Sequence, residues 1–311
     1  MNSTTNGCIT WLPPGHADQA DLGVLTVGWN VRDLLLENIE ALLRSEGSIT
    51  AELIVIDNHS RDRTVEAVRE KFSFARVLVN EKNLGFSFAN NQGMAVAHAR
   101  HILLLNPDMR VEPNALQKTV EYLDTHPDVA IVGGQLSTPE GMIVKSVRHF
   151  ATLSSQLAIL LKLPHLSPAT LKNYLWNDFD YTREQSIEAV RGSYLAIQGA
   201  ARQSLGGLDP RFFLWFEDMD YCKQAISAGW KVMYVPTIRA IDLVGQSFKQ
   251  VNLYTSQERF TRALILYFKK WHPGWQVWIL KILRPPLLLV AWIVEFCLRL
   301  FGIKKYRRVE T

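Results

Sequence analysis

The stretch that decides the fold class is Leu53-Ile-Val-Ile-Asp57-Asn58-His59-Ser60, a short apolar, β-branched run that ends in polar residues. Continuous apolar runs of this length are typical of strands that are covered on both faces. Three more such runs are found, at 22–27, 76–79 and 102–105, and helical patterns lie between the runs, at 31–45, 62–71 and 88–99. Strands that alternate with helices indicate βαβ units. We therefore predict an α/β fold with a mostly parallel sheet and helices on both faces.

Polar residues follow each predicted strand. Asn30 comes shortly after the first run, Asp57 directly after the second, Asn83 and Gly85 after the third, and Asp108 after the fourth. In an open α/β sheet, ligands bind at the carboxyl ends of the strands. These residues are therefore the first candidates for a binding site.

Composition excludes several classes of protein. A hydrophobic content of 48% and a charged content of 21% exclude a disordered or fibrous chain. The three cysteines lie far apart, which argues against a disulfide framework or a Cys-rich zinc module and fits a reducing compartment. Residues 1–20 are polar and lack a basic segment leading into an apolar run, so we expect no secretory signal and a cytoplasmic location.

Asp57 and the turn from Asn83 to Asn91 each allow two interpretations. A carboxylate that ends a buried strand can accept hydrogen bonds from a ribose hydroxyl or a base N–H, but Asp57 could instead cap the helix beginning near residue 62. The small and amide residues of Asn83–Gly93 let donors approach an anion or a nucleotide, or they form a glycine turn with an asparagine cap. They match neither the three-glycine dinucleotide fingerprint nor a P-loop.

Two acidic groups allow both a catalytic and a structural role. Asp108, in Asn106-Pro107-Asp108, could bind a divalent cation that bridges two phosphates, or the tripeptide could be a simple turn. Farther along lie three acids among bulky aromatic residues, Glu217, Asp218 and Asp220. Close like charges raise one another's pKa, which is a route to a general base, whereas the structural alternative is a solvated helix start.

The ordered set of motifs resembles the family 2 glycosyltransferases, and in particular their rhamnosyltransferase-like branch. The resemblance covers roughly residues 22–250. The matching segments are Val27-Gly-Trp-Asn30, Val55-Ile-Asp57-Asn58-His-Ser60, Asn83-Leu-Gly-Phe86, Asn91-Gln-Gly93, Leu104-Leu-Asn-Pro-Asp108, Gly206-Gly-Leu-Asp209, Phe213-Leu-Trp-Phe-Glu217-Asp218-Met-Asp220 and Ala228-Gly-Trp230 running to Pro236.

The resemblance implies a GT-A fold that binds a nucleotide-sugar donor and a divalent cation, Mg²⁺ or Mn²⁺. By position, Asp57 would hold the base or ribose of the donor, with Asn30 and the turn containing Asn83, Gly85 and Asn91 close by.

The same resemblance implies roles for the acids. Asp108 matches the last acid of a degenerate metal-binding motif, and Asp218 matches the general base, with Glu217 and Asp220 supporting it. Where the family often has a histidine, near the end of the catalytic domain, this chain has Asp242. Because Mg²⁺ and Mn²⁺ accept oxygen ligands, Asp242 is a second candidate metal ligand.

The C-terminal region differs from the rest in charge. Residues 258–311 carry eleven Lys/Arg against three Asp/Glu, interleaved with aromatic residues. The apolar run Pro285–Val294 has half of the roughly 20 residues that span a bilayer, and we expect Pro285-Pro286 to interrupt the preceding helix. Tryptophan with Lys/Arg suits helices that lie on an anionic membrane surface, here the inner face of the cell membrane. The alternative is a helical pair packed on the catalytic domain. No nucleic-acid-binding motif is present, so no nucleic-acid partner is expected.

These observations predict three regions: an N-terminal tail at 1–20, a GT-A domain at 21–250 and a helical C-terminal region at 251–311. Removal of residues after about 257 should then release the protein from membranes while the catalytic fold survives. The expected function is inverting, metal-assisted transfer of a sugar to a lipid-linked glycan or polysaccharide acceptor in cell-surface polysaccharide synthesis. dTDP-rhamnose is the donor that the resemblance implies.

Two other functions remain open. One is a catalytically inactive sugar-nucleotide-binding or assembly protein on the same fold. The other is a nucleotidyltransferase, which would need a Gly-rich basic loop after the first strand; Val27–Arg32 does not provide one.

Overall fold

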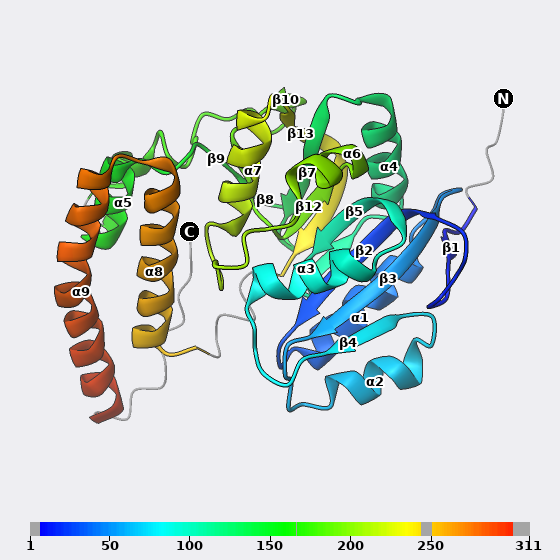
Figure 1. Ribbon diagram of the computed structural model, residues 1–311, viewed down its shortest axis with the longest axis horizontal. Coiled ribbons are helices and arrows are strands. Elements are labelled where there is room, and N and C mark those ends of the chain that lie inside the picture. The colour runs from blue at the N-terminus through cyan, green and yellow to red at the C-terminus, as the bar shows by residue number, and fades with distance from the viewer. Residues whose placement is uncertain (1–6, 166, 244–250, 301–311) are drawn as a thin grey trace.

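A mixed sheet forms the centre of the molecule in the computed structural model, which describes residues 7–165, 167–243 and 251–300 (Figure 1). The strand order along its main path is β1-β3-β2-β5-β12-β7-β13-β10, with β4 paired to β3, β6 to β13 and β8 to β7. The strands are β1 (Thr10–Trp11), β2 (Ala20–Gly28), β3 (Thr50–Asp57), β4 (Arg76–Val79), β5 (Ala99–Leu105), β6 (Met109–Val111), β7 (Val129–Ser137), β8 (Ile143–Val144), β10 (Gln185–Ser186), β12 (Tyr194–Ile197) and β13 (Lys231–Asp242), while β9 (Val147–Arg148) and β11 (Ala189–Val190) form a separate pair.

Helices cover the sheet and extend beyond it on one side. They are α1 (Arg32–Leu43), α2 (Thr64–Lys71), α3 (Phe86–Val96), α4 (Ala115–Thr125), α5 (Leu153–Leu160), α6 (Gly199–Leu205), α7 (Glu217–Ser227), α8 (Leu253–Trp271) and α9 (Gly274–Leu300), with short 3₁₀ turns η1 (Leu163–His165) and η2 (Pro168–Leu171). In Figure 1, α8 and α9 lie side by side at one end of the molecule, away from the strands β1–β4.

The sheet is parallel in its first half and mixed in its second. Strands β1, β3, β2, β4 and β5 pair in parallel, as the βαβ pattern predicts. The late strand β12 is antiparallel to both of its neighbours and lies between β5 and β7. It therefore joins the two halves.

Consecutive strand residues point to opposite faces, and both faces are buried. Ile54 belongs to the apolar core on one side and Val55 to the core on the other, both without solvent exposure. The same holds for Leu103 and Leu104 on β5. Because both faces are covered, the strands appear in the sequence as continuous apolar runs. The predicted α/β class and the helices on both faces are confirmed.

The helix α8 is part of the main core. Its side chains Ala263, Leu264, Tyr267 and Phe268 are buried in the same apolar cluster as the sheet residues. Deleting this helix would expose that cluster. The structure therefore does not support the expectation that the catalytic fold survives truncation after residue 257.

The helix α9 corrects the expectation of a break at the two prolines. It runs without interruption from Gly274 to Leu300, with Pro285 and Pro286 inside it. Proline lacks an amide donor, but its fixed φ is close to the helical value, so the backbone can continue as a helix through both residues. Among the described residues, α9 is the one helix long and apolar enough to cross a membrane by length and composition, and 17% of its most apolar window is buried.

Candidate active site

The loops after β2 and β3 are tied together around Asp57. The Ser60 amide donates to Asp57 Oδ2 at 2.9 Å, and the Ser60 hydroxyl accepts from the Asn30 amide at 2.9 Å. The Asn30 side chain accepts from the Arg61 amide at 2.7 Å. Asn30 and Asp57 are thus brought together at the carboxyl ends of neighbouring strands. Because Asp57 bonds Ser60, ahead of α2, it does not cap that helix.

Asp57 lines a pocket of about 390 Å³ at the ends of β3 and β4. The residue is 1% exposed, and its Oδ1 atom has no hydrogen-bond partner among the residues that the structure describes. A buried carboxylate oxygen without a donor is costly unless a ligand or water supplies one. His59 and Asn80 also line the pocket, and its size is within the range of small-molecule sites.

The turn from Asn83 to Gly85 lies against a distant loop. The Gly85 amide donates to Asn83 Oδ1 at 3.0 Å, and the Phe86 amide donates to the Phe213 carbonyl at 2.7 Å. Gly85 has φ +86°, and a Cβ there would overlap the backbone of Phe213. Position 85 therefore needs glycine because two chain segments cross there. Its predicted role in donor binding stays a prediction.

Asn91 joins α3 to the loop before α7. Its Nδ2 donates to the Leu208 carbonyl at 2.7 Å, and its Oδ1 accepts from the Leu208 amide at 2.9 Å. Both the Nδ2 and the Oδ1 atom of Asn91 are thus hydrogen-bonded to the backbone of Leu208. The structure gives Asn91 a part in positioning this loop, and its predicted contact with the donor stays untested.

Asp108 and Asp242 lie on adjacent segments. Strand β13 pairs with β6 so that Asp242 is opposite Met109, and the Leu243 amide donates to the Asp108 carbonyl at 3.0 Å. The two residues are 6% and 4% exposed. Within the described residues there is no cluster of three or more His, Cys, Asp or Glu side chains around a common point. Two buried carboxylates nevertheless fit a hard cation that takes its other oxygens from substrate phosphates and water.

Asp218 is on the first turn of α7 and is half-buried. Its Oδ2 accepts from the Gly192 amide at 3.0 Å, and its Oδ1 accepts from the Met219 amide at 2.7 Å. Ser193, which follows Gly192 in the chain, accepts a hydrogen bond at its carbonyl oxygen from the Asn106 amide at 3.0 Å. A short path of backbone bonds therefore connects Asp218 to the turn that carries Asp108.

The residues that lead into α7 have an unusual backbone. Trp215 and Phe216 both have left-handed conformations, with φ of 69° and 67°. Two successive non-glycine residues in this region are strained and persist only where the surroundings hold them. These two residues lead directly into the first turn of α7, where Asp218 accepts from the Gly192 amide.

Glu217 is the most perturbed acid of the site. It is 5% exposed, and its Oε2 atom has no hydrogen-bond partner among the described residues. Burial raises the pKa of this carboxyl well above its ordinary value, and the nearby charge of Asp218 adds to the effect. Glu217 therefore binds a proton more readily than an exposed glutamate.

Asp220 is directed away from Asp218, toward the C-terminal helices. Its carboxylate is fully buried and accepts from Lys270 Nζ at 2.8 Å, Trp271 Nε1 at 2.7 Å and Gln224 Nε2 at 2.7 Å. It fastens the end of α8 to α7. The acids that the sequence grouped together thus have different surroundings.

Sequence reasoning missed three residues that position the site. Asn38 of α1 donates to the Met109 carbonyl at 2.7 Å and supports the turn of Asp108. Asn80 donates to Asn58 Oδ1 at 3.1 Å below the Asn83 turn. Gly192 donates to Asp218. Asn80 follows β4 directly and could have been found by the rule used for Asp57; Asn38 and Gly192 carry no signal in the sequence.

Comparison with known proteins now identifies the family. A family model described as Glycosyl transferase family 2 matches residues 24–181, just over half of the chain. The chain belongs to glycosyl transferase family 2. It is therefore a glycosyltransferase by family, as the sequence motifs predicted.

This family 2 glycosyltransferase is similar to an N-acetylglucosaminyl-diphospho-decaprenol L-rhamnosyltransferase of Mycobacterium tuberculosis. The two are 24% identical over 219 residues, which cover 66% of this chain and 71% of the relative. The predicted likeness to rhamnosyltransferases is confirmed at this level.

Solved structures show the fold. The mannosyltransferase PcManGT from Pyrobaculum calidifontis, in complex with GDP-Man and Mn²⁺, aligns with a TM-score of 0.55 and 14% identity over 96% of this chain and 83% of its own. GalNAc-T7 with UDP, GalNAc and Mn²⁺ aligns with a TM-score of 0.52 and 14% identity over 72% of this chain and 43% of its own. The predicted GT-A fold is confirmed.

Proposed function

We propose that this family 2 glycosyltransferase transfers rhamnose from dTDP-rhamnose to a lipid-linked glycan in cell-surface polysaccharide synthesis. The observation that carries the proposal is the backbone connection between Asp218 and the turn of Asp108, next to Asp242. Such a site has one acid for the acceptor and two for the donor diphosphate. The mycobacterial relative, named as a rhamnosyltransferase acting on a diphospho-decaprenol, supports the choice of sugar and acceptor.

Asp57 would bind the nucleoside of the donor. Asp57 lines the 390 Å³ pocket, and its buried Oδ1 atom, which lacks a donor among the described residues, would accept from a base N–H or a ribose hydroxyl. Ser60 and Asn30 hold the two loops around it. A ligand that supplies the missing donor removes the cost of burying an unpaired oxygen, which favours binding there.

Asp108 and Asp242 would hold a divalent cation, Mg²⁺ or Mn²⁺. When bound, the cation neutralises charge on the leaving diphosphate. Asp242 is buried on β13 and Asp108 is buried in the turn just before the paired strand β6, so their positions are fixed before the donor arrives. The presence of Mn²⁺ in both solved structures of similar fold supports this assignment.

Asp218 would act as the general base. The acceptor hydroxyl oxygen attacks the anomeric carbon, the bond from that carbon to the diphosphate oxygen breaks, and the hydroxyl proton goes to the Asp218 carboxylate. A single displacement of this kind inverts the anomeric configuration. The bonds from Gly192 and Met219 orient the carboxylate while leaving lone pairs for the acceptor. Proton transfer of this type contributes about 10²–10⁴-fold to the rate.

The C-terminal helices would keep the enzyme on the inner face of the cell membrane. Exposed apolar side chains run along α9, among them Trp278, Ile282, Leu289, Ile293 and Phe296. Exposed apolar surface of this extent marks an interaction site. Together with the basic residues of 258–311, it fits the anionic leaflet of a bilayer.

A panel assay tests the function. Purified protein is incubated with dTDP-, UDP- and GDP-linked sugars, with and without Mn²⁺, and with a lipid-diphosphate-linked glycan as acceptor. We expect metal-dependent transfer from one donor, with inverted stereochemistry by NMR. Donor binding without transfer to any acceptor would instead favour the inactive sugar-nucleotide-binding protein.

A further inference from the structure

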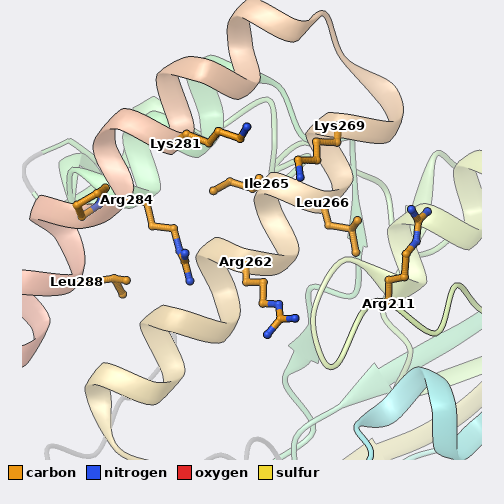
Figure 2. Close-up of a pocket in the computed structure, with 9 residues that line it drawn as sticks. Arg211, Arg262, Ile265, Leu266, Lys269, Lys281, Arg284 and Leu288 are labelled. Carbon is orange, nitrogen blue, oxygen red and sulfur yellow. The ribbon is translucent and has the colours of Figure 1, made fainter.

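A basic pocket of about 600 Å³ lies between α8 and α9, outside the proposed catalytic site (Figure 2). We call it the α8–α9 pocket. Its cationic side chains come from three segments of the chain: Arg211 from the loop before α7, Arg262 and Lys269 from α8, and Lys281 and Arg284 from α9. Among the residues that the structure describes, no acidic side chain lines it.

Apolar side chains line the same pocket between the cations. Ile265 and Leu266 come from α8, and Pro285 and Leu288 come from α9. On each helix, the lining residues follow the spacing i, i+3, i+4 and i+7, so one stripe of each helix faces the other. The pocket is therefore amphipathic, with apolar walls and cationic groups around them.

Only part of the positive charge is neutralised within the protein. Arg211 pairs with Asp209 at 2.6 Å, and Arg284 pairs with Glu258 at 2.8 Å. Lys281 lies over the ring of Trp278, with Nζ 4.8 Å from its centroid, an interaction that leaves the charge in place.

The remaining two cations have no such partner. Arg262 and Lys269 are exposed, and within the described part of the chain no ion pair or hydrogen bond involves either side chain. With Lys281, they leave three positive charges uncompensated around one pocket. An anionic ligand with more than one charge fits this arrangement.

We infer that the α8–α9 pocket binds the diphosphate of the lipid-linked acceptor. The inference rests on the proposed function and names where the acceptor is held. A diphosphate diester carries one negative charge on each phosphate, and these two charges would be balanced by two of the three uncompensated cations. The apolar walls and the adjoining exposed face of α9 suit the first hydrocarbon units, whereas free phosphate or pyrophosphate has no apolar surface to bury there.

The pocket is connected to the proposed base. Lys269 precedes Lys270, whose Nζ contacts Asp220 at 2.8 Å, two residues after Asp218. Arg211 belongs to the loop that leads into α7. A lipid diphosphate in the pocket would thus lie near the loop that leads into α7 and near the end of α8 that is bound to Asp220.

A binding experiment with full-length protein tests the inference. The probe is farnesyl diphosphate in phosphatidylcholine vesicles, compared with farnesol in the same vesicles, phosphatidylglycerol vesicles of equal surface charge and inorganic pyrophosphate. The variant is Arg262→Gln with Lys269→Gln. The matched control is Arg44→Gln with Lys172→Gln, which removes the same charge from exposed sites elsewhere.

We expect the wild type to bind farnesyl diphosphate vesicles best. The pocket variant should lose about 10- to 30-fold in affinity for them, and the control pair less than threefold, because each cation contributes about 1 kcal/mol at an anionic surface. Equal loss in both pairs, or equal recruitment by phosphatidylglycerol, would reduce the pocket to a general anionic-surface contact and overturn the inference. Pyrophosphate binding as tight as that of the lipid would also overturn it.

The proposed function can fail separately. If wild-type protein binds farnesyl diphosphate through Arg262 and Lys269 but transfers no sugar from any donor, the proposed function is wrong and the pocket assignment is not. If it transfers sugar equally well to acceptors with and without a lipid diphosphate, the pocket assignment is wrong and the transferase function stands.

Discussion

Replacing Asp220 by alanine should destabilise the protein strongly, although Asp220 is only two residues from the proposed base. Its buried carboxylate accepts hydrogen bonds from Lys270, Trp271 and Gln224 at 2.7–2.8 Å. Removing one partner of a buried ion pair costs about 3–5 kcal/mol. The lower end applies here, because the Lys270 side chain keeps 24% exposure and has Asp209 at 3.5 Å as a second partner. We expect a loss of about 3 kcal/mol.

The assay is thermal unfolding followed by circular dichroism in a mild detergent. For a domain of this size, 1 kcal/mol corresponds to about 2–4 °C, so Asp220→Ala should lower Tm by about 6–12 °C. Asp220→Asn keeps an acceptor for Trp271 and should lose about half as much. The control is Asp218→Asn, in the same turn of α7, whose Tm should stay within about 2 °C of wild type. An Asp220→Ala protein that melts with the wild type would refute the account of Asp220 as the anchor of α8.

Three further predictions concern the other acids. Asp218→Asn should abolish transfer while donor affinity by calorimetry stays within a few-fold, because a base acts on the acceptor; full turnover would remove Asp218 from the mechanism. Asp108→Ala should weaken metal-dependent donor binding, and normal binding at the same Mn²⁺ concentration would leave Asp108 as a turn residue. At pH values above neutral, the Glu217→Gln protein should have a higher Tm than the wild type. The raised pKa of Glu217 means that the folded state holds its proton longer than the unfolded one, so wild-type stability falls as pH rises from about 4.5 through the folded pKa. If both proteins show the same pH dependence of Tm between pH 5 and 9, Glu217 is not the buried acid described here.

The sheet, and the polar residues at the carboxyl ends of its strands, could be predicted because they follow from local sequence patterns. Apolar runs gave the strands β2 to β5, and polar residues after them gave Asp57 and Asp108. The position of Asp242 next to the turn of Asp108 follows from the register of β6 and β13, in which Asp242 is opposite Met109. No local pattern contains that register.

The acidic motif shows why the rest could not be predicted. Residues two apart on a helix do not share a face, so Asp218 and Asp220 had to diverge once α7 began at Glu217. Which of them is available for the proposed role as base depends on α8, about 50 residues later, because Lys270 and Trp271 donate hydrogen bonds to Asp220. The prediction that Pro285 and Pro286 interrupt the helix was wrong for a related reason. Whether a proline interrupts a helix depends on more than the local sequence.

The central place of β12 has a consequence for how the chain folds during synthesis. Strands β5 and β7 are both made before residue 138, but β12, which lies between them, begins at Tyr194. At roughly 5–20 residues per second, the ribosome needs about 3–12 s to cover these roughly 60 residues. During that interval β5 lacks its neighbour β12, and β7 lacks both β12 and the still later strand β13, so both present edges of the kind through which strands join to other chains. The nascent polypeptide should therefore depend on chaperones most strongly from about residue 137 onward, well before α8 and α9 are made.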